Sequence, residues 1–160
     1  MDTYSSIPIE SPGINLAIVR QDSDAWRFLL LKRAEGQSYP GFWGFLTGRR
    51  EGNETVAQLA VRELREETGL SPLKLFASEY CVQFYEPAVD RVWILPVIVA
   101  VVDSGETVKL CEENSDFRWV TAAEALELLE WQNVIDAVQN LDRELKRYPA
   151  ASWVELPVER

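Results

Sequence analysis

Apolar residues gather in two short runs near the start of the chain, INLAIVR at residues 14–20 and FLLLKR at residues 28–33. Runs of this length are typical of buried strands. The polar segment between them, residues 21–25, is short enough for a turn, and the pattern therefore predicts a β-hairpin. The Gly- and Pro-punctuated aromatic segment that follows, residues 39–47, predicts a loop with a short strand at its end.

The periodicity changes after residue 53. Residues 54–68 predict a helix, with Asn53 as its N-cap and Gly69 in the position where a glycine ends a helix. One stripe of this helix is suited to face a hydrophobic core; it consists of Ala57, Ala60, Val61, Leu64 and Thr68.

Strand patterns return in the second half of the chain, at residues 73–85 and 92–102. The second is almost continuously apolar, which indicates burial on both faces, and Pro96 within it indicates a bulge or an edge position. A further short strand is predicted at residues 117–120.

Two helices close the pattern. Thr121 is suited to cap a helix over residues 122–129, with Glu124 completing a capping box, and a final helix covers residues 133–147 before Pro149. Strands that bracket a central helix, with further helices after them, predict an α+β fold in which a mixed sheet lies between helices. Without a repeat or a linker-like segment, residues 1–160 are expected to form a single domain.

Composition narrows the class of protein. With 160 residues, 47% of them hydrophobic and 26% charged, the chain can build one ordinary globular core. It has no apolar run of the ~20 residues that cross a bilayer, and the first twelve residues lack the pattern of a secretory signal. Cys81 and Cys111 have no metal-ligand spacing and are expected to be reduced, mostly buried thiols of a cytosolic protein.

The charge balance limits the chemistry. A net charge of −10 argues against a general nucleic-acid binder or a protein of anionic membranes. The absence of histidine excludes Ser-His-Asp hydrolysis and His-ligated zinc, so carboxylates become the expected catalytic groups.

Three carboxylates share one face of the predicted central helix. Glu63, Glu66 and Glu67 are spaced i, i+3, i+4 and project within about 100° of arc. Clustered oxygen ligands suit Mg²⁺ or Mn²⁺. The alternative is a solvated face that Arg62 and Arg65 partly neutralise.

The segment GRREGNETVAQLAVRELREETGL, residues 48–70, resembles the signature of the Nudix family, G-x5-E-x7-R-E-U-x-E-E-x-G-U with U aliphatic. Seven fixed residues at ordinary usage make a chance match on the order of 10⁻⁸ per position. FLLLKR, GFWGFLTG and DFRWVTAAEALELL are also similar to family segments, so the resemblance covers about residues 13–147. The domain is thus expected to be a Nudix-type α/β/α sandwich. One departure is Thr47, where many members have a second glycine.

The resemblance implies a metal-dependent pyrophosphohydrolase. It assigns divalent-metal binding to Glu63, Glu66 and Glu67, with the backbone carbonyl of Thr47. Glu54 and Arg62 resemble the pair that steadies the loop and orients Glu63, and a purely structural role for both stays open. Two further acidic residues, Glu113 and less favourably Glu112, are candidates for a fourth metal ligand. Glu113 or Glu63 is the expected base for the attacking water.

Candidate substrate contacts are fewer. Arg33 is the first choice for a phosphate contact because a guanidinium can bind phosphate through two bonds; Arg49 and Arg50 follow. Asn133 stands where the family often places a side chain that reads the base, although an N-cap role explains it equally well. Trp43, Phe42 and Trp131 could stack on a base, with burial in the core the better expectation for Trp43.

The substrate class is expected to be a small-molecule nucleotide or pterin triphosphate, of the dATP or dihydroneopterin triphosphate type, with release of pyrophosphate. Tyr85 and Pro87 keep dinucleoside polyphosphate and ADP-ribose or nucleoside-diphosphate-sugar hydrolysis as alternatives. A Nudix fold used only for binding, or an unrelated acidic scaffold, would lack metal-dependent turnover. Whether the chain forms a homodimer stays open, as does the role of Trp153, in a dimer interface or in the core.

Overall fold

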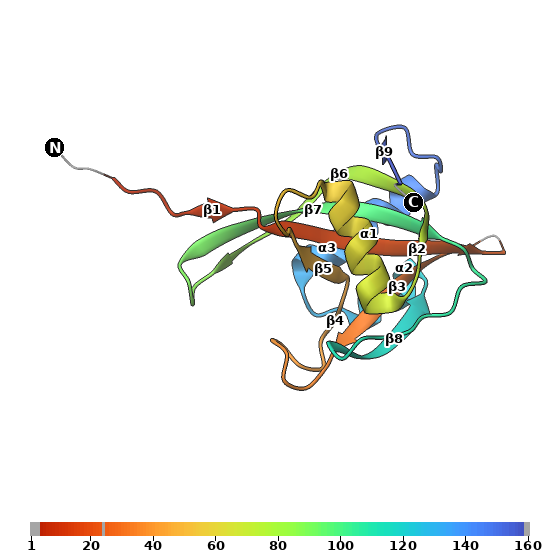
Figure 1. Ribbon diagram of the computed structural model, residues 1–160, viewed down its shortest axis with the longest axis horizontal. Coiled ribbons are helices and arrows are strands. Elements are labelled where there is room, and N and C mark those ends of the chain that lie inside the picture. Colours follow the sequence, from red (N-terminus) through yellow and green to blue (C-terminus); the bar gives the residue numbers. More distant parts are fainter. Residues whose placement is uncertain (1–3, 24, 159–160) are drawn as a thin grey trace.

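In the computed structural model, which describes residues 4–23 and 25–158, one mixed sheet carries helices on both faces (Figure 1). The strands are β1 (Ile9–Glu10), β2 (Gly13–Asp22), β3 (Ala25–Arg33), β4 (Trp43–Gly44), β5 (Leu46–Arg49), β6 (Pro72–Glu86), β7 (Arg91–Val102), β8 (Asn114–Val120) and β9 (Val154–Leu156). The helices are α1 (Val56–Thr68), α2 (Ala122–Leu128) and α3 (Gln132–Leu145).

The centre of the sheet is formed by β3, β2, β7 and β6, in that order. β2 runs parallel to β7, whereas β2 with β3 and β6 with β7 are antiparallel pairs. The predicted hairpin of residues 14–33 is confirmed; Asp24 in its turn lies outside the described residues. The predicted mixed sheet between helices, an α+β fold, is also confirmed.

The alternation of side chains along β2 divides the core in two. Ile14, Leu16 and Ile18 pack with the apolar stripe of α1, while Ala17 and Val19 pack with apolar residues of α2 and α3 on the opposite face. Because successive strand residues point to opposite faces, a strand covered on both sides reads as a continuous apolar run.

Helix α1 begins two residues later than predicted. Its N-cap is Thr55 and not Asn53: the Thr55 hydroxyl accepts a hydrogen bond from Gln58 N, and the Gln58 side chain accepts one from Thr55 N, which completes a capping box. Gly69 ends the helix with φ at 71°, in the left-handed region, as predicted.

The later elements confirm most of the pattern. Opposite Val97, next to Pro96, the register of β6 shifts, so the predicted bulge is present. The Thr121 hydroxyl accepts a hydrogen bond from Glu124 N at the start of α2. The N-cap of α3 is Trp131, which makes no side-chain capping bond, so an N-cap role for Asn133 is wrong.

Burial corrects one expectation and decides another. Cys81 and Cys111 are free thiols, but Cys81 is exposed rather than buried. Trp153 is 7% exposed and packs against Phe76, which places it in the core. Within residues 4–23 and 25–158, each helix is too short or too polar to span a bilayer.

Candidate active site

β5, which leads into the loop before α1, approaches the helix so closely that only glycine fits at one of its positions. A Cβ atom built on Gly48 would lie 2.4 Å from Glu63 Cγ, and one built on Gly13 would lie 1.8 Å from Gly48 O. β5 and the start of β2 therefore form a flat floor on which the Glu63 side chain rests. Glu63 is largely covered, and this burial raises the pKa of its carboxyl.

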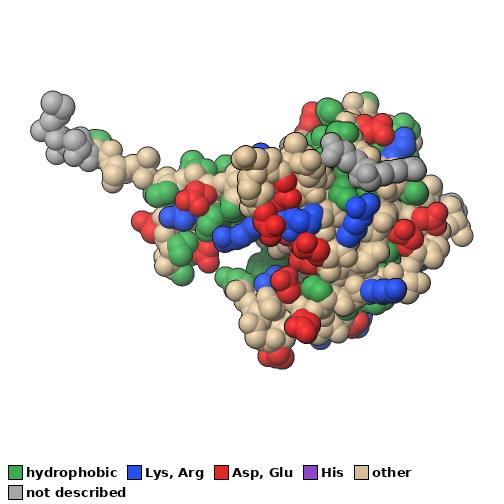
Figure 2. Space-filling model, viewed as in Figure 1, with side chains coloured by type: hydrophobic (Ala, Val, Ile, Leu, Met, Phe, Trp, Pro, Cys, Tyr) green, Lys and Arg blue, Asp and Glu red, His purple; other side chains and the backbone are tan. Residues whose placement is uncertain are grey.

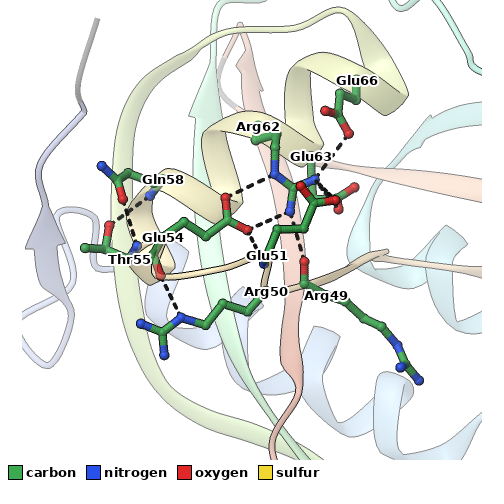
Figure 3. A network of polar contacts seen from close by, with 9 residues as sticks. All are labelled: Arg49, Arg50, Glu51, Glu54, Thr55, Gln58, Arg62, Glu63 and Glu66. Atoms are coloured by element: carbon green, nitrogen blue, oxygen red, sulfur yellow. Dashed lines mark hydrogen bonds and ion pairs between the residues drawn. The ribbon is translucent and has the colours of Figure 1, made fainter.

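A single guanidinium holds this loop and the acidic face of α1 together (Figure 3). Arg62 donates two hydrogen bonds to the Glu54 carboxylate, at 2.7 and 3.1 Å, and one to Arg49 O at 2.9 Å. Its Nη1 donates to Glu63 at 2.9 Å and to Glu66 at 3.2 Å. The hydrogen bonds between Glu54 and Arg62 are the main reason that the pKa of Glu54 is lowered and that the pKa of Arg62 is raised.

Glu67 faces another direction from Glu66. It is 8% exposed, and its carboxyl is within hydrogen-bonding reach of Glu113 and 3.4 Å from Asn114 Nδ2, which donates to it. Burial first, then the hydrogen bond and the negative charge of Glu113, raise the pKa of Glu67 to about 8. The buried Glu67 of α1 thus meets Glu113, an exposed residue directly before β8.

Beside these carboxyls the molecule is hollowed by a cavity of about 430 Å³, visible in Figure 2 next to a group of acidic and basic side chains. Glu67, Glu113 and Asn114 line it at one side, with Thr47 and Gly48 of β5. Apolar side chains of both core halves and rings from loops form much of the remaining wall, including Phe45, Val82, Phe84, Leu95, Tyr39, Trp131 and Val134.

Most of the predicted substrate residues line this cavity. Arg33 and Arg49 do so from the ends of β3 and β5, and Asn133 does so from the first turn of α3. Trp43 does not: it is 9% exposed and packs in the core on the α3 side, as the core alternative expected. The tryptophan that reaches the cavity near this loop is Trp131, which packs edge-on against Tyr39.

Other candidates point elsewhere. Arg50 donates a hydrogen bond to Glu54 O at 2.6 Å, and Tyr85 donates one to Asp90 at 2.8 Å. Neither residue lines the cavity, and neither do Glu112 and Pro87. Phe42 packs on Trp131, with ring centroids 5.0 Å apart.

Sequence reasoning missed several polar or aromatic residues of the cavity wall, four of which are polar groups or indoles with a clear place in the site. Trp93 donates a hydrogen bond from Nε1 to Glu86 at 2.6 Å, and the Arg49 guanidinium lies 5.9 Å from the Trp93 ring centroid. Asn114 bonds to Glu67, and Asn15 lies in the middle of the apolar run 14–19. Only Asn15 carried a signal in the sequence, because one amide interrupts an otherwise apolar run.

The carboxylate set fits a divalent cation. The raised pKa of Glu67 reflects a carboxyl that is buried beside another acidic side chain, and hard oxygen donors of this kind suit Mg²⁺ or Mn²⁺. In the described part of the chain no group of three acidic or thiol side chains has the arrangement of metal ligands. Glu63 and Glu66 are both paired with Arg62.

The chain is similar in sequence to several known proteins. The chain is 29% identical over 149 residues to a dihydroneopterin triphosphate diphosphatase of Haemophilus influenzae, with 83% of this chain and 89% of that protein covered. It is 33% identical over 127 residues to an octanoyltransferase of Myxococcus xanthus, covering 79% of this chain and 35% of that protein. The chain thus spans about a third of the second relative's length.

Among solved structures, the MutT protein of Methanosarcina mazei Go1 superposes with a TM-score of 0.71 at 25% identity, covering 89% of this chain and 99% of that one. The family model described as the NUDIX domain matches residues 12–141, a range that holds Arg33, the whole Arg62 network and Glu113. The chain belongs to the NUDIX domain family.

Proposed function

We propose that this protein is a metal-dependent pyrophosphohydrolase that cleaves a phosphoanhydride bond in a nucleoside or pterin triphosphate and releases pyrophosphate. The observation that carries the proposal is the Glu67–Glu113 pair, which lies in the wall of a cavity of about 430 Å³ and beside a third carboxylate fixed by Arg62. The similarity to a dihydroneopterin triphosphate diphosphatase supports the triphosphate class.

Glu63, Glu66, Glu67 and Glu113 would hold Mg²⁺ or Mn²⁺, together with the backbone carbonyl of Thr47. A divalent cation at such a site neutralises phosphate charge and lowers the pKa of a bound water. The carboxylates of α1 and the one before β8 lie close together, and without a bound cation their negative charges would repel one another.

Arg62 acts as a positioning residue. Its guanidinium is held by Glu54 and by Arg49 O, and through Nη1 it fixes Glu63 over the backbone of Gly48. Glu113 or Glu63 then takes the proton of the attacking water; both are carboxylates beside the cavity or the loop that lines it.

Arg33 and Arg49 are the phosphate contacts in this proposal, because both line the cavity and a guanidinium pairs with phosphate oxygens through two bonds. Asn133 and the Trp131 ring lie in the same wall and provide an amide and an aromatic face for the organic part of the substrate.

The test is a panel of (d)NTPs, dihydroneopterin triphosphate, ADP-ribose and Ap4A, assayed for hydrolysis with Mg²⁺ and with EDTA. Glu66→Gln and Glu67→Gln should each lower Mg²⁺-dependent kcat by at least about 100-fold while circular dichroism shows an intact fold. The matched control is Glu112→Gln, an exposed neighbour outside the cavity, which should retain activity. Full activity of the Glu67→Gln variant would reject the metal assignment.

The panel also separates the alternatives. Preferred cleavage of ADP-ribose or Ap4A would keep the metal site and replace the substrate class. Binding of nucleotides with no turnover of any compound would instead support a Nudix fold used as a binding module.

A further inference from the structure

Asn15 is a polar residue in the floor of the cavity. It lies on β2, where its neighbours in the adjacent strands are Thr47 of β5 and Val97 of β7. It is 4% exposed, and the side chains before and after it, Ile14 and Leu16, are also buried.

The Asn15 side chain has no partner within the described part of the chain: no described residue forms a hydrogen bond with its amide. Its amide atoms are not among the described side-chain atoms that are sealed from solvent without a partner, so water in the cavity can satisfy them, and a ligand that displaces this water has to offer hydrogen bonds in its place. An apolar residue at this place would suit the fold better, since the face that Asn15 shares with Ala17 and Val97 is apolar. Departures of this kind from the fold's own preferences are expected at functional sites.

The chemistry of the amide indicates what it binds. One NH₂ group and one carbonyl oxygen present a donor and an acceptor side by side, without charge. Phosphate oxygens have cationic partners in the same cavity, Arg33 and Arg49, whereas the neighbours of Asn15 across the sheet, Thr47 and Val97, carry no charge. A neutral, hydrogen-bonding group with apolar faces fits this part of the wall.

We infer that Asn15 is a specificity-determining residue, which binds the uncharged nucleoside-like or pterin part of the substrate by hydrogen bonds from the floor of the cavity. The inference rests on the proposed function in that it takes the cavity to be the substrate site. It adds to that function the residue that recognises the organic part.

The experiment measures binding, so it does not depend on turnover. Guanosine, adenosine and neopterin are titrated into wild-type protein and Asn15→Leu by NMR, alongside ribose 5-phosphate and Mg²⁺ with inorganic triphosphate. Asn140→Leu is the matched control, because Asn140 lies on α3 outside the cavity lining. We expect the Kd of the preferred nucleoside or pterin to rise at least about tenfold in Asn15→Leu, and that of triphosphate to stay within about twofold.

The same variant should unfold at a temperature no lower than that of the wild type, which a merely structural asparagine would not allow. An unchanged nucleoside Kd, an equal loss of triphosphate binding, or no nucleoside binding to the wild type would each overturn the inference. Weakened binding of ribose 5-phosphate in the variant would place the contact on the sugar, and unaffected binding would place it on the heterocycle; both support the inference.

If Asn15→Leu fails to fold, the inference can still be tested on the wild-type protein. The side-chain NH₂ resonances of Asn15 should shift on addition of the nucleoside and not on addition of triphosphate, and unshifted resonances overturn the inference. A protein that hydrolyses nothing can still pass this test, so its outcome is separate from that of the proposed function.

Discussion

The position of the Glu63 carboxylate depends on a residue without a side chain. Because a Cβ atom on Gly48 would lie 2.4 Å from Glu63 Cγ, Gly48→Ala must displace that side chain or the loop. We expect kcat/KM to fall at least about tenfold and the free energy of unfolding to fall by about 1–3 kcal/mol. Steady-state kinetics and urea unfolding measure the two effects.

Gly105→Ala is the control for the glycine substitution. A Cβ atom there would approach only the Asp103 side chain, at 3.2 Å, and Gly105 does not line the cavity. Loss of activity in both variants would mean that the effect is not specific to Glu63.

The ion pair between Glu54 and Arg62 predicts a pH dependence. The pKa of Glu54 is lowered from 4.5 in the folded protein, so its contribution to stability is present above that value and is lost as the pH falls through the folded pKa. The wild type should therefore melt at a higher temperature than Glu54→Gln at pH 7, and the gap should close in acid. Thermal unfolding from pH 7 downward measures it.

Glu51→Gln serves as the comparison for that pH series. The Glu51 side chain is 73% exposed and lies 3.6 Å from Arg62, so its substitution should open a smaller gap at pH 7. A gap between wild type and Glu54→Gln that persists in acid would contradict the assigned pKa direction.

At the scale of elements, α1 joins the apolar core to the acidic site, and its first turn is fixed by a local contact. Thr55→Ala removes the hydroxyl that accepts from Gln58 N and should lower the free energy of unfolding by about 1 kcal/mol. The glutamates lie two to three turns further along the helix, so kcat/KM should change by less than about twofold.

Chemical denaturation and kinetics check the capping prediction together. Thr107→Ala, in the segment between β7 and β8, is the control and should leave both quantities nearly unchanged. A large loss of activity in Thr55→Ala would show that the helix start and the site move together.

Elements with a strong pattern could be predicted from the sequence, whereas those made by tertiary contacts could not. The apolar run of β2 and the periodic helix α1 gave their type and nearly their bounds. β1 and β9 have two and three residues, and each exists because a neighbouring strand offers hydrogen bonds, at β7 and β6. The cap of α1 was misplaced because Asn53 and Thr55 are both good caps.

The site shows the same limit. The spacing of Glu63, Glu66 and Glu67 placed them on one helix, but the separation of Glu67 from Glu66 depends on Arg62 and on the approach of β8. Glu86 and Trp93 come from the two strands of the β6–β7 hairpin, and only the folded register brings them to one wall. The position of Trp43 could not be decided from the sequence either, because an aromatic residue is compatible with both a core and a cavity position; the fold places it in the core.

At the scale of the whole molecule, binding of a cation to the folded form alone raises the stability of the protein. Mg²⁺ at about ten times its Kd should add about 1.4 kcal/mol to the free energy of unfolding, and EDTA should remove this gain. Differential scanning fluorimetry at fixed ionic strength measures it, with Ca²⁺ and Na⁺ for comparison.

The variant Glu67→Gln separates cation binding from general salt effects. It keeps the shape of the side chain and can donate to Glu113, so its stability without metal should be at least that of the wild type, and Mg²⁺ should not raise it. A full Mg²⁺ response in this variant would place the cation elsewhere.

Trp93 and Trp131 stand in the cavity wall, while Trp43 and Trp153 are sealed in the interior. The protein therefore contains its own optical reporter of occupancy. A bound heterocycle should quench or shift the emission of the two wall indoles without any attached dye. The four other indoles of the chain, Trp26, Trp43, Trp119 and Trp153, would provide a constant background in the same spectrum. The variants Trp131→Phe and Trp93→Phe would then show which of the two indoles responds to the bound ligand.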